Sequence, residues 1–347
     1  MSVAIRSCSP DDLERLIPLL DEEFVFGKGR AISLRQRFPT VFCRDNLHRI
    51  LLCADEDGIV SALALRLFDW QADGETFRGA MIGMVYTSPA RRGEGWASRL
   101  LATAATRLRD EGADFGVLWT GQAEFYARLG WKAADCSILG EIELDQATPE
   151  ATDAVNSPLC KRGAGGDFSD AENRDTVEIP PTPPLQRGEP QGEHQPSPQE
   201  RTCVHGLTIG VDEQFPEELR RRWLNATTLR RPEDYRQLPL PAERVDLLRH
   251  EDQDKAAYAL LGSSGTTGFL YELAGHPDSY AALWREACRD RQRIFVNDSR
   301  DSPSALWLSR HTGIIWQNKR LAMWLPLSAR VTAPRLEQWV IPYFDRI

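Results

Sequence analysis

The sequence of 347 residues is short of the residues that build metal and redox centres. It has 6 histidines, all isolated, and 7 cysteines, none of them in a Cys-x-x-Cys pair. Protein metal sites need several His or Cys ligands at short spacings, so we expect no metal ion. The odd number of scattered cysteines and the lack of a signal peptide lead us to expect a protein of the reducing cytoplasm.

The sequence also has no excess of positive charge and no long apolar run. Its formal net charge is −9. A nucleic-acid scaffold or a protein bound to an anionic membrane surface would carry a basic excess, so we expect neither partner. No apolar run approaches the length that spans a bilayer, so we expect no membrane segment. The acidic balance is compatible with a cationic amine substrate.

Two common Gly-rich phosphate loops are missing as well. There is no Gly-x-x-x-x-Gly-Lys-Ser/Thr, which argues against a nucleotide hydrolase, and no Gly-x-Gly-x-x-Gly with a downstream acid, which argues against a dinucleotide-binding fold. A different Gly-rich junction is present, since residues 81–97 read MIGMVYTSPARRGEGWA. The apolar run Met81–Thr87 predicts a buried strand, and an apolar repeat of about four residues from Trp96 predicts a helix.

This strand–turn–helix junction predicts an anion site. The first N–H groups of a helix have no intrahelical partner, and the helix dipole favours negative charge there. Gly93 and Gly95 would let a pyrophosphate approach the main chain, or would supply backbone angles that other residues avoid. Arg92 adds a positive charge with several donors. The alternatives are a phosphate-binding fold of another kind and an ordinary junction without a ligand.

Two motifs in this region resemble those of a known family. Arg92-x-x-Gly95-x-Ala97, preceded by a strand and Pro89, resembles the acetyl-CoA signature Gln/Arg-x-x-Gly-x-Gly/Ala of the GCN5-related N-acetyltransferases (GNAT). Downstream, residues 122–131 read QAEFYARLGW and resemble the family's second motif. The pattern Tyr-x-Arg-x-Gly-aromatic is similar to that of two-domain acetyltransferases of the enhanced-intracellular-survival type. The resemblance spans about residues 3–145.

The resemblance implies an α/β (α+β) fold with a mixed, mostly antiparallel sheet flanked by helices. It also implies acetyl-CoA as cosubstrate. Main-chain N–H groups of Val85 and Thr87, where two strands diverge, would hold the pantetheine and polarise the thioester carbonyl. The residues that it assigns to CoA are Val85, Tyr86, Thr87, Arg92, Gly93, Glu94, Gly95, Trp96, Ala97 and Ser98.

The resemblance also implies catalytic roles. Tyr126 would be the general acid that protonates the departing thiolate, and a half-buried structural tyrosine is the alternative. The general base stays open between Glu124, a chain of water molecules and the chain's own C-terminal carboxylate. The last of these takes part in some of the two-domain enzymes and would belong to Ile347 here.

Residues 1–150 are predicted to form the catalytic domain. A helix should begin after Ser9, whose side chain can cap it, and Pro18 should kink or split that helix. Asp21, Glu22 and Glu23 at its end could attract an amine, although a solvated acidic helix end explains them more simply. Helices are also expected at residues 96–111 and 122–129, and strands of one sheet at residues 49–54, 59–67, 80–87, 115–120, 131–134 and 138–143.

Residues 151–203 are predicted to be a disordered insert or linker. Most of this stretch is rich in Pro and Gly, and Phe168 is the one aromatic residue between residues 156 and 201. Such a segment cannot bury enough apolar surface to offset the entropy lost on ordering.

Residues 204–347 are predicted to be a second domain that repeats the first. Helices are expected at residues 216–229 and 278–288, and strands at residues 256–261, 268–273, 293–296, 314–317 and 321–327. The turn that corresponds to the CoA loop, Leu273–Pro277, has no arginine and one glycine. We therefore interpret this part as a degenerate GNAT-like domain without a CoA motif.

The resemblance implies an acetyl-CoA-dependent N-acetyltransferase in which a small-molecule or peptide amine attacks the thioester directly. The alternative hypothesis is a CoA-binding sensor or scaffold without turnover. The sequence leaves the acceptor amine and the oligomeric state open.

Overall fold

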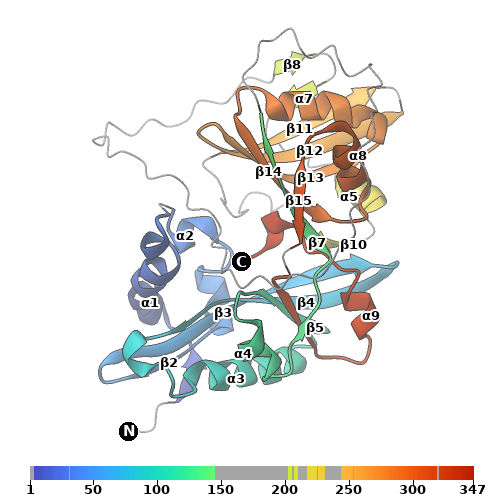
Figure 1. The fold of residues 1–347 in the computed structure, drawn as a ribbon. Coiled ribbons are helices and arrows are strands. Elements are labelled where there is room, and N and C mark those ends of the chain that lie inside the picture. Colours follow the sequence, from blue (N-terminus) through green and yellow to red (C-terminus); the bar gives the residue numbers. More distant parts are fainter. Residues whose placement is uncertain are drawn as a thin grey trace, which may run out of the picture.

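The structure is a computed structural model, and it describes residues 4–30, 32–144, 202–204, 207–209, 217–224, 226–230, 244–252, 254–318 and 320–347. The predicted linker, residues 151–203, lies outside this part of the chain except for Thr202 and Cys203. Two sheets with helices on their faces make up the described fold (Figure 1). The predicted α/β class, with mixed and mostly antiparallel sheets, is confirmed.

The first sheet has the strand order β1-β2-β3-β4-β5-β16-β6, and β10 pairs with β3 beside this path. Its neighbours are antiparallel except β4 and β5, which are parallel. The strands are β1 (Ile5–Ser7), β2 (Ile50–Asp55), β3 (Gly58–Ala72), β4 (Glu75–Thr87), β5 (Phe115–Trp119), β6 (Lys132–Ala133), β10 (Ala226–Leu229) and β16 (Ala322–Pro326).

Helices cover both faces of the first sheet, because alternate residues of a strand point to opposite faces. Ala62 and Ala64 of β3 belong to the cluster that packs on α1 (Pro10–Phe24). Leu63 and Leu65 belong to the cluster that packs on α3 (Trp96–Asp110). The remaining elements here are η1 (Phe26–Lys28), α2 (Leu34–Arg37), η2 (Arg44–Arg49), η3 (Pro89–Arg91) and α4 (Ala123–Ala127).

Helix α1 begins as predicted but is not split. Ser9 caps it, and Asp12 completes a capping box by accepting from the Ser9 main chain at 2.9 Å. Pro18 lies inside one continuous helix, so the predicted split at this residue is wrong, while the alternative prediction of a kink stays a prediction. Its missing N–H removes one hydrogen bond, whereas Leu16, Ile17 and Leu20 around it are buried and hold the helix in place.

The second sheet has the strand order β15-β7-β14-β13-β12-β11-β9-β8, and β13 and β14 are its parallel pair. Its strands are β7 (Ser137–Glu143), β8 (Thr202–Val204), β9 (Leu207–Ile209), β11 (Arg244–Asp252), β12 (Lys255–Ser264), β13 (Thr267–Gly275), β14 (Arg293–Ser299) and β15 (Ile315–Asn318). The elements beside it are α5 (Glu217–Trp223), η5 (Pro277–Ser279), α7 (Tyr280–Cys288) and α8 (Pro303–His311). This arrangement repeats that of the first sheet, with its parallel pair in the corresponding place.

The two halves of the chain exchange one strand each. Strand β7, which we placed in the first sheet, lies between β14 and β15 of the second. Strand β16, which we placed in the second, lies between β5 and β6 of the first. Each exchanged strand pairs on both sides, so it satisfies its backbone groups as fully as a local strand would. Periodicity indicates a strand but not the sheet that receives it.

Two further predictions in the second half were wrong in part. The helix predicted at residues 216–229 ends at Trp223, and Ala226–Leu229 instead pairs with Asp69–Ala72 of β3. Helix α8 was not predicted, although Ser302 caps it and Pro303 occupies its first position.

The C-terminal segment returns to the first sheet after β16. Helix α9 (Ala333–Leu336) precedes Trp339, whose ring lies 5.0 Å from Phe77 and 5.3 Å from Phe115 between ring centroids. The last turn, η6 (Tyr343–Asp345), then crosses between the two sheets. Among the described helices, none is long and apolar enough to cross a membrane.

Candidate active site

Strand β4 has a bulge just beyond its pairing with the parallel strand β5. Ala62 pairs with Tyr86 and Ala64 with Gly83, so Met84 and Val85 together face one residue of β3. Met84 has a φ of 52°, a strained angle for a residue with a side chain. A bulge re-aims the strand that carries it, and this one lies close to where β4 leaves β5.

The two parallel strands diverge before the bulge. Their pairing ends at Met81 and Val117, although β5 continues to Trp119 and pairs with β16 on its other side. Within the part of the chain that the structure describes, β4 from Ile82 to Thr87 has no partner strand on the β5 side. This leaves an open main-chain edge to which an extended, amide-bearing ligand could add as a further strand. Val85, Tyr86 and Thr87 all lie on this stretch.

The Gly-rich turn leads from this edge to the start of α3. Gly93 and Gly95 have φ angles of 89° and 81°, and a Cβ on either would meet no atom within 4 Å. Gly95 is the N-cap of α3 and no side chain caps the helix, so its first N–H groups have no side-chain acceptor. Both predicted reasons for glycine therefore hold at this turn: the left-handed angle and the open space above the main chain.

The charged residues of the turn already have ion-pair partners, either within the turn or in α1. Arg92 donates to Glu23 at 2.9 Å and to the Thr87 carbonyl at 3.2 Å, and its side chain is 53% exposed. Glu94 accepts from Arg91 and from the Trp96 indole at 2.8 Å. A phosphate bound at this turn would compete with Glu23 for the guanidinium of Arg92. It would not meet an unpaired carboxylate at Glu94, because that carboxylate already accepts from Arg91 and Trp96.

The remaining residues assigned to CoA differ in exposure. Trp96 is buried against Cys53 and Val60, whereas Ala97 and Ser98 in the first turn of α3 are partly exposed. Tyr86 is buried, and its carbonyl accepts from Ser61 at 2.5 Å. The hydroxyl of Ser61 also lies 3.0 Å from that of Thr87. Trp96 is thus a core residue, while a ligand could reach the partly exposed Ala97 and Ser98.

Tyr126 lies in the apolar cluster between the diverging strands. It is 8% exposed, and its cluster includes Ile82 and Val85 of β4 and Leu118 of β5. Its ring meets that of Trp131 edge to face at 6.1 Å. Burial raises the pKa of Tyr126 to about 12, so the phenol is protonated at neutral pH, as it would be at its ordinary pKa, and the shift itself makes it a weaker acid.

Of the other residues considered for proton transfer, Glu124 is exposed, whereas Ile347 lies beside the bulge of β4. Glu124, two residues before Tyr126, is exposed to solvent, whereas Tyr126 is buried, so the two side chains lie in different surroundings. Ile347 lies on the bulge: its side chain and carbonyl are 3.1 and 3.3 Å from where a Cβ on Gly83 would be. Ile347 also packs with Met84 against the cluster that holds α1 and α2.

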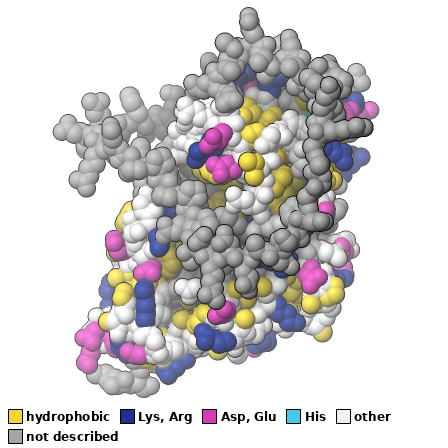
Figure 2. All heavy atoms as spheres, viewed as in Figure 1, with side chains coloured by type: hydrophobic (Ala, Val, Ile, Leu, Met, Phe, Trp, Pro, Cys, Tyr) yellow, Lys and Arg dark blue, Asp and Glu magenta, His cyan; other side chains and the backbone are white. Residues whose placement is uncertain are grey.

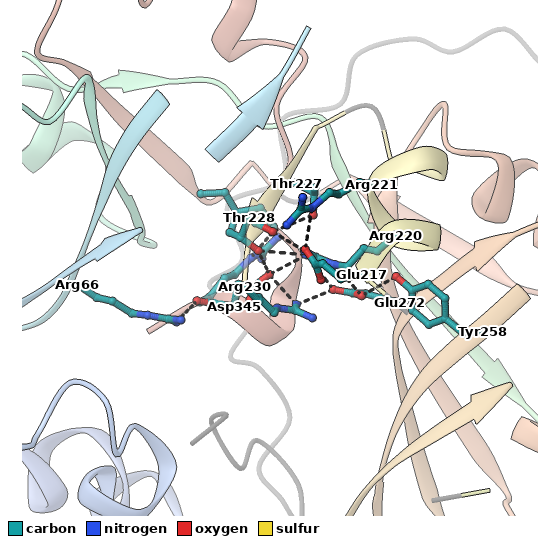
Figure 3. A network of polar contacts seen from close by, with 12 residues as sticks. Arg66, Glu217, Arg220, Arg221, Thr227, Thr228, Arg230, Tyr258, Glu272 and Asp345 are labelled. Carbon is teal, nitrogen blue, oxygen red and sulfur yellow. Dashed lines mark hydrogen bonds and ion pairs between the residues drawn. The ribbon is translucent and has the colours of Figure 1, made fainter. Parts of the chain in front are cut away.

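A buried ionic network holds the segment that ends at Ile347 (Figure 3). Asp345 accepts from Arg230 Nε at 2.7 Å and from Thr228 Oγ1 at 2.6 Å. Glu272 of β13 accepts from Arg230 at 2.6 Å and from Arg220 Nε at 3.2 Å. The carbonyl of Asp345 accepts from Arg66 of β3 at 2.9 Å.

This network joins elements of both sheets. The side chains of Arg220, Arg230, Glu272 and Asp345 are at most 3% exposed. Burial alone would raise the pKa of Asp345, but Arg230 and Arg220 lower it to about 2. Sequence reasoning missed this group, because Arg220 opens the run Arg220–Arg222, which is typical of a solvated helix face.

The second sheet has no counterpart of the Gly-rich turn. Strand β13 ends at Gly275, where a Cβ would lie 2.4 Å from the Ala256 carbonyl oxygen. The short turn η5 then leads directly into α7, and His276 Nδ1 accepts from the main chain of Asp278 at 3.3 Å. The turn is packed and closed, which fits our interpretation that this half carries no CoA motif.

The described residues contain no group of three or more His, Cys, Asp or Glu side chains that could hold a metal ion. The predicted CoA residues fit an elongated anionic cosubstrate, because the open β4 edge could accept amide groups and the Gly-rich helix start could accept phosphates.

Comparison with known proteins gave a family match and several structural relatives. Residues 4–134 match the model of an acetyltransferase (GNAT) domain. The comparison with curated proteins gave no match. A GCN5-related N-acetyltransferase from Anabaena variabilis ATCC 29413 has a similar fold, with a TM-score of 0.62 and 13% identity over 94% of this chain and 73% of that one.

Two other solved structures share this fold. A GCN5-related N-acetyltransferase from Kribbella flavida gives a TM-score of 0.58 and 14% identity over 93% of this chain and 70% of that one. Eis1 from Mycobacterium abscessus gives a TM-score of 0.56 and 15% identity over 94% of this chain and 74% of that one. At these identities the likeness concerns the fold, and it extends over both sheets.

Proposed function

We propose that this protein is an acetyl-CoA-dependent N-acetyltransferase, because residues 4–134 match the model of an acetyltransferase (GNAT) domain. The observation that carries the proposal is the continuous path from the open edge of β4 to the uncapped start of α3. The edge offers main-chain groups to the pantetheine amides, and the helix start offers N–H groups to the pyrophosphate. Tyr126 lies in the cluster between the strands that diverge along this path.

In the proposed reaction a neutral amine attacks the carbonyl carbon of the acetyl thioester. The C–N bond forms, an oxyanion develops, and main-chain N–H groups at Val85 and Thr87 stabilise it. The C–S bond then breaks, and the thiolate of CoA takes the proton of the Tyr126 phenol. The nitrogen loses one proton to a base, and the phenol is restored from solvent, so charge and protons balance.

We further propose that residues 1–150 carry the catalytic domain, that residues 204–347 form a second domain without a CoA motif, and that the protein works in the cytoplasm. The cysteines known to be unpaired are Cys8, Cys43, Cys53, Cys136 and Cys288, and free cysteines are usual in a reducing compartment. On the face shown in Figure 2, basic and acidic side chains of the described residues are interspersed and form no basic stripe. We therefore propose a small-molecule or peptide amine as the partner.

The decisive experiment separates binding from turnover. Acetyl-CoA should raise the melting temperature while ATP at the same concentration should not, because the turn lacks a nucleotide-hydrolase motif. Thiol release from acetyl-CoA, followed across a panel of amines, should then identify an acceptor. Tight CoA binding without thiol release on any amine would favour the alternative, a CoA-binding sensor or scaffold. A shift with ATP but not with acetyl-CoA would favour a phosphate-binding fold of another kind.

A further inference from the structure

The last residue of the chain packs directly on the bulge of β4. The Cγ1 atom of Ile347 lies 3.1 Å, and its carbonyl 3.3 Å, from where a Cβ on Gly83 would be. Ile347 packs with Met84 against the cluster that holds α1 and α2, and also against the cluster that contains Trp339. It therefore fills the space between two apolar clusters, over the point of β4 where Gly83 has no side chain.

The bulge needs support because its main chain is strained. Met84 has a φ of 52°, and such an angle persists only where the surrounding structure holds it. On one side β3 pairs with Gly83 and Tyr86, which flank the bulge. On the β5 side, none of the described strands pairs with β4 beyond Met81. The packing of Ile347 on Gly83 is thus a second hold on this stretch of β4.

Both sheets fix the position of Ile347. Two residues before it, Asp345 belongs to the buried ionic network that joins elements of the two sheets (Figure 3). Arg346 donates to Asn297 of β14 at 2.9 Å, and its guanidinium carbon lies 4.8 Å from the centroid of the Trp119 ring of β5. Each of the last three residues therefore contacts groups outside the C-terminal segment, and the chain end is held on the bulge.

The bulge also carries a main-chain group that we propose to act on the thioester. Val85 directly follows Met84, and it packs in the cluster that contains Tyr126. The N–H of Val85 belongs to the peptide unit that joins it to Met84, so a change in the Met84 main chain turns this N–H. A donor stabilises an oxyanion well only when it is aimed before the reaction starts. Support for the bulge is therefore support for this donor.

We propose that Ile347 is a positioning residue, whose side chain holds the bulge of β4 so that the Val85 N–H points at the thioester carbonyl. This inference rests on the proposed acetyltransferase function and gives the second half of the chain a part in it. The role belongs to the apolar side chain of Ile347 and is distinct from proton transfer by the C-terminal carboxylate.

The kinetic test removes the side chain and keeps the carboxylate. Ile347→Ala should lower kcat by about ten- to a hundredfold, because a misaimed donor loses much of its effect on the transition state. The Kd of CoA, measured by calorimetry, should stay within about threefold, since the Gly-rich turn does not contact this residue. The pH profile of kcat should keep its shape. Ile347→Leu, which restores the apolar volume, should recover most of the rate.

The matched control is Ile341→Ala, the same substitution in the same C-terminal segment. Ile341 is 1% exposed in the cluster that contains Trp339. The control should lower the melting temperature at least as much as Ile347→Ala but leave kcat within about twofold where both variants are folded. Ile341→Val replaces it where alanine prevents folding. Equal loss of kcat in both positions would make Ile347 a structural residue and overturn the proposal. A shifted pH profile in Ile347→Ala would overturn it too, because it would indicate a displaced base.

The contact with Gly83 gives a second kinetic test. Gly83→Ala would place a Cβ 3.1 Å from Ile347 Cγ1, closer than packed carbon atoms lie, so it should also lower kcat. If both residues act through this contact, the loss in the double variant Gly83→Ala/Ile347→Ala should be smaller than the product of the single losses. Losses that multiply would place the effect of Ile347 elsewhere and contradict the proposal.

Hydrogen exchange tests the hold on the bulge without turnover. Amides of residues 81–87 should exchange faster in Ile347→Ala than in the unaltered protein or in Ile341→Ala, because the bulge opens more often when its packing is lost. If the unaltered protein acetylates no amine, the proposed function fails, while this measurement still decides whether Ile347 holds the bulge. Unchanged exchange in this stretch would refute the positioning role.

Discussion

At the scale of single residues, the proposed catalytic role of Tyr126 depends on its hydroxyl group. The hydroxyl of Tyr126 has no hydrogen-bond partner among the described residues, although the aromatic ring that carries it packs against Phe125 and Trp131. The oxygen is not among the buried side-chain atoms that lack a partner, so it stays open to solvent while the ring is packed, and a ligand could reach it. This favours a role for the hydroxyl itself.

We therefore predict that Tyr126→Phe lowers kcat by roughly ten- to a thousandfold and leaves the affinity for CoA within a few fold. The ring stays packed on Phe125 and Trp131, and only the proton donor is lost. The measurement is steady-state kinetics under conditions where chemistry limits the rate. Tyr280→Phe, which removes a buried phenol from α7, is the control and should have no effect on kcat. Full turnover in Tyr126→Phe would make Tyr126 a structural residue.

A second prediction at this scale concerns Gly95. A glutamate there would place a carboxylate on the helix start that should hold the pyrophosphate, so Gly95→Glu should weaken acetyl-CoA binding by at least about a hundredfold. Gly112, at the other end of α3, has a φ of 75° and the same open space, against 81° at Gly95. Gly112→Glu therefore carries the same backbone strain away from the site. Calorimetry should find CoA affinity lost in the first variant only; equal affinity in both would remove this turn from the site.

At the scale of elements, the sequence predicted what local rules decide. The cap of α1, the buried stripe of α3 and the positive φ angles at Gly93 and Gly95 follow from side chains close to one another in the chain. The fate of β7 and β16 could not be predicted, because the two sheets offer equivalent places between a parallel strand and an edge strand. Period-2 patterns are the same in either sheet.

The same limit applied to the site. The loop glycines and Tyr126 stand in local motifs, so sequence reasoning found them. Asp345 gains its meaning only from groups far away in the chain, such as Arg230. A lone aspartate near the end of the chain gives no signal that it is buried between two arginines.

The cap of α1 gives a prediction with a defined pH dependence. Arg6 lowers the pKa of Asp12 well below its usual range, against the effect of burial. Its ionised form therefore adds stability that is complete above the unfolded pKa of about 3.9 and is lost as pH falls toward the folded value. Asp12→Asn should cost about 1–2 kcal/mol at pH 7 and progressively less below about pH 4. Its exposed neighbour, Asp11→Asn, is the control for melting curves against pH; parallel curves for both variants would contradict this account.

At the scale of the whole molecule, the buried network is the ionic contact that joins the two sheets to the C-terminal segment. Asp345→Ala would remove a buried carboxylate that accepts from both Arg220 and Arg230, so we expect a loss of about 3–5 kcal/mol in the free energy of unfolding. The exposed pair Lys255–Asp278 is the control, and Asp278→Ala should cost much less than Asp345→Ala. Denaturant unfolding measures both. Because the folded pKa of Asp345 is about 2, the difference should be constant above about pH 4 and shrink only below it.

The exchange of β7 and β16 has a consequence for the order in which the protein is made. Strand β6 ends at Ala133, whereas β16, its neighbour in the sheet, begins at Ala322. At 5–20 residues per second, a ribosome needs about 10–40 s to add the missing strand, and during this time the β5 edge has no partner. A second nascent chain could donate its own β16 to that edge, which would give a domain-swapped dimer. The fraction of such dimers in newly made protein should therefore rise with the density of ribosomes on the mRNA. Gel filtration after expression at high and low induction would measure the difference in dimer fraction. An unchanged, wholly monomeric profile would mean that the β5 edge is protected until synthesis ends.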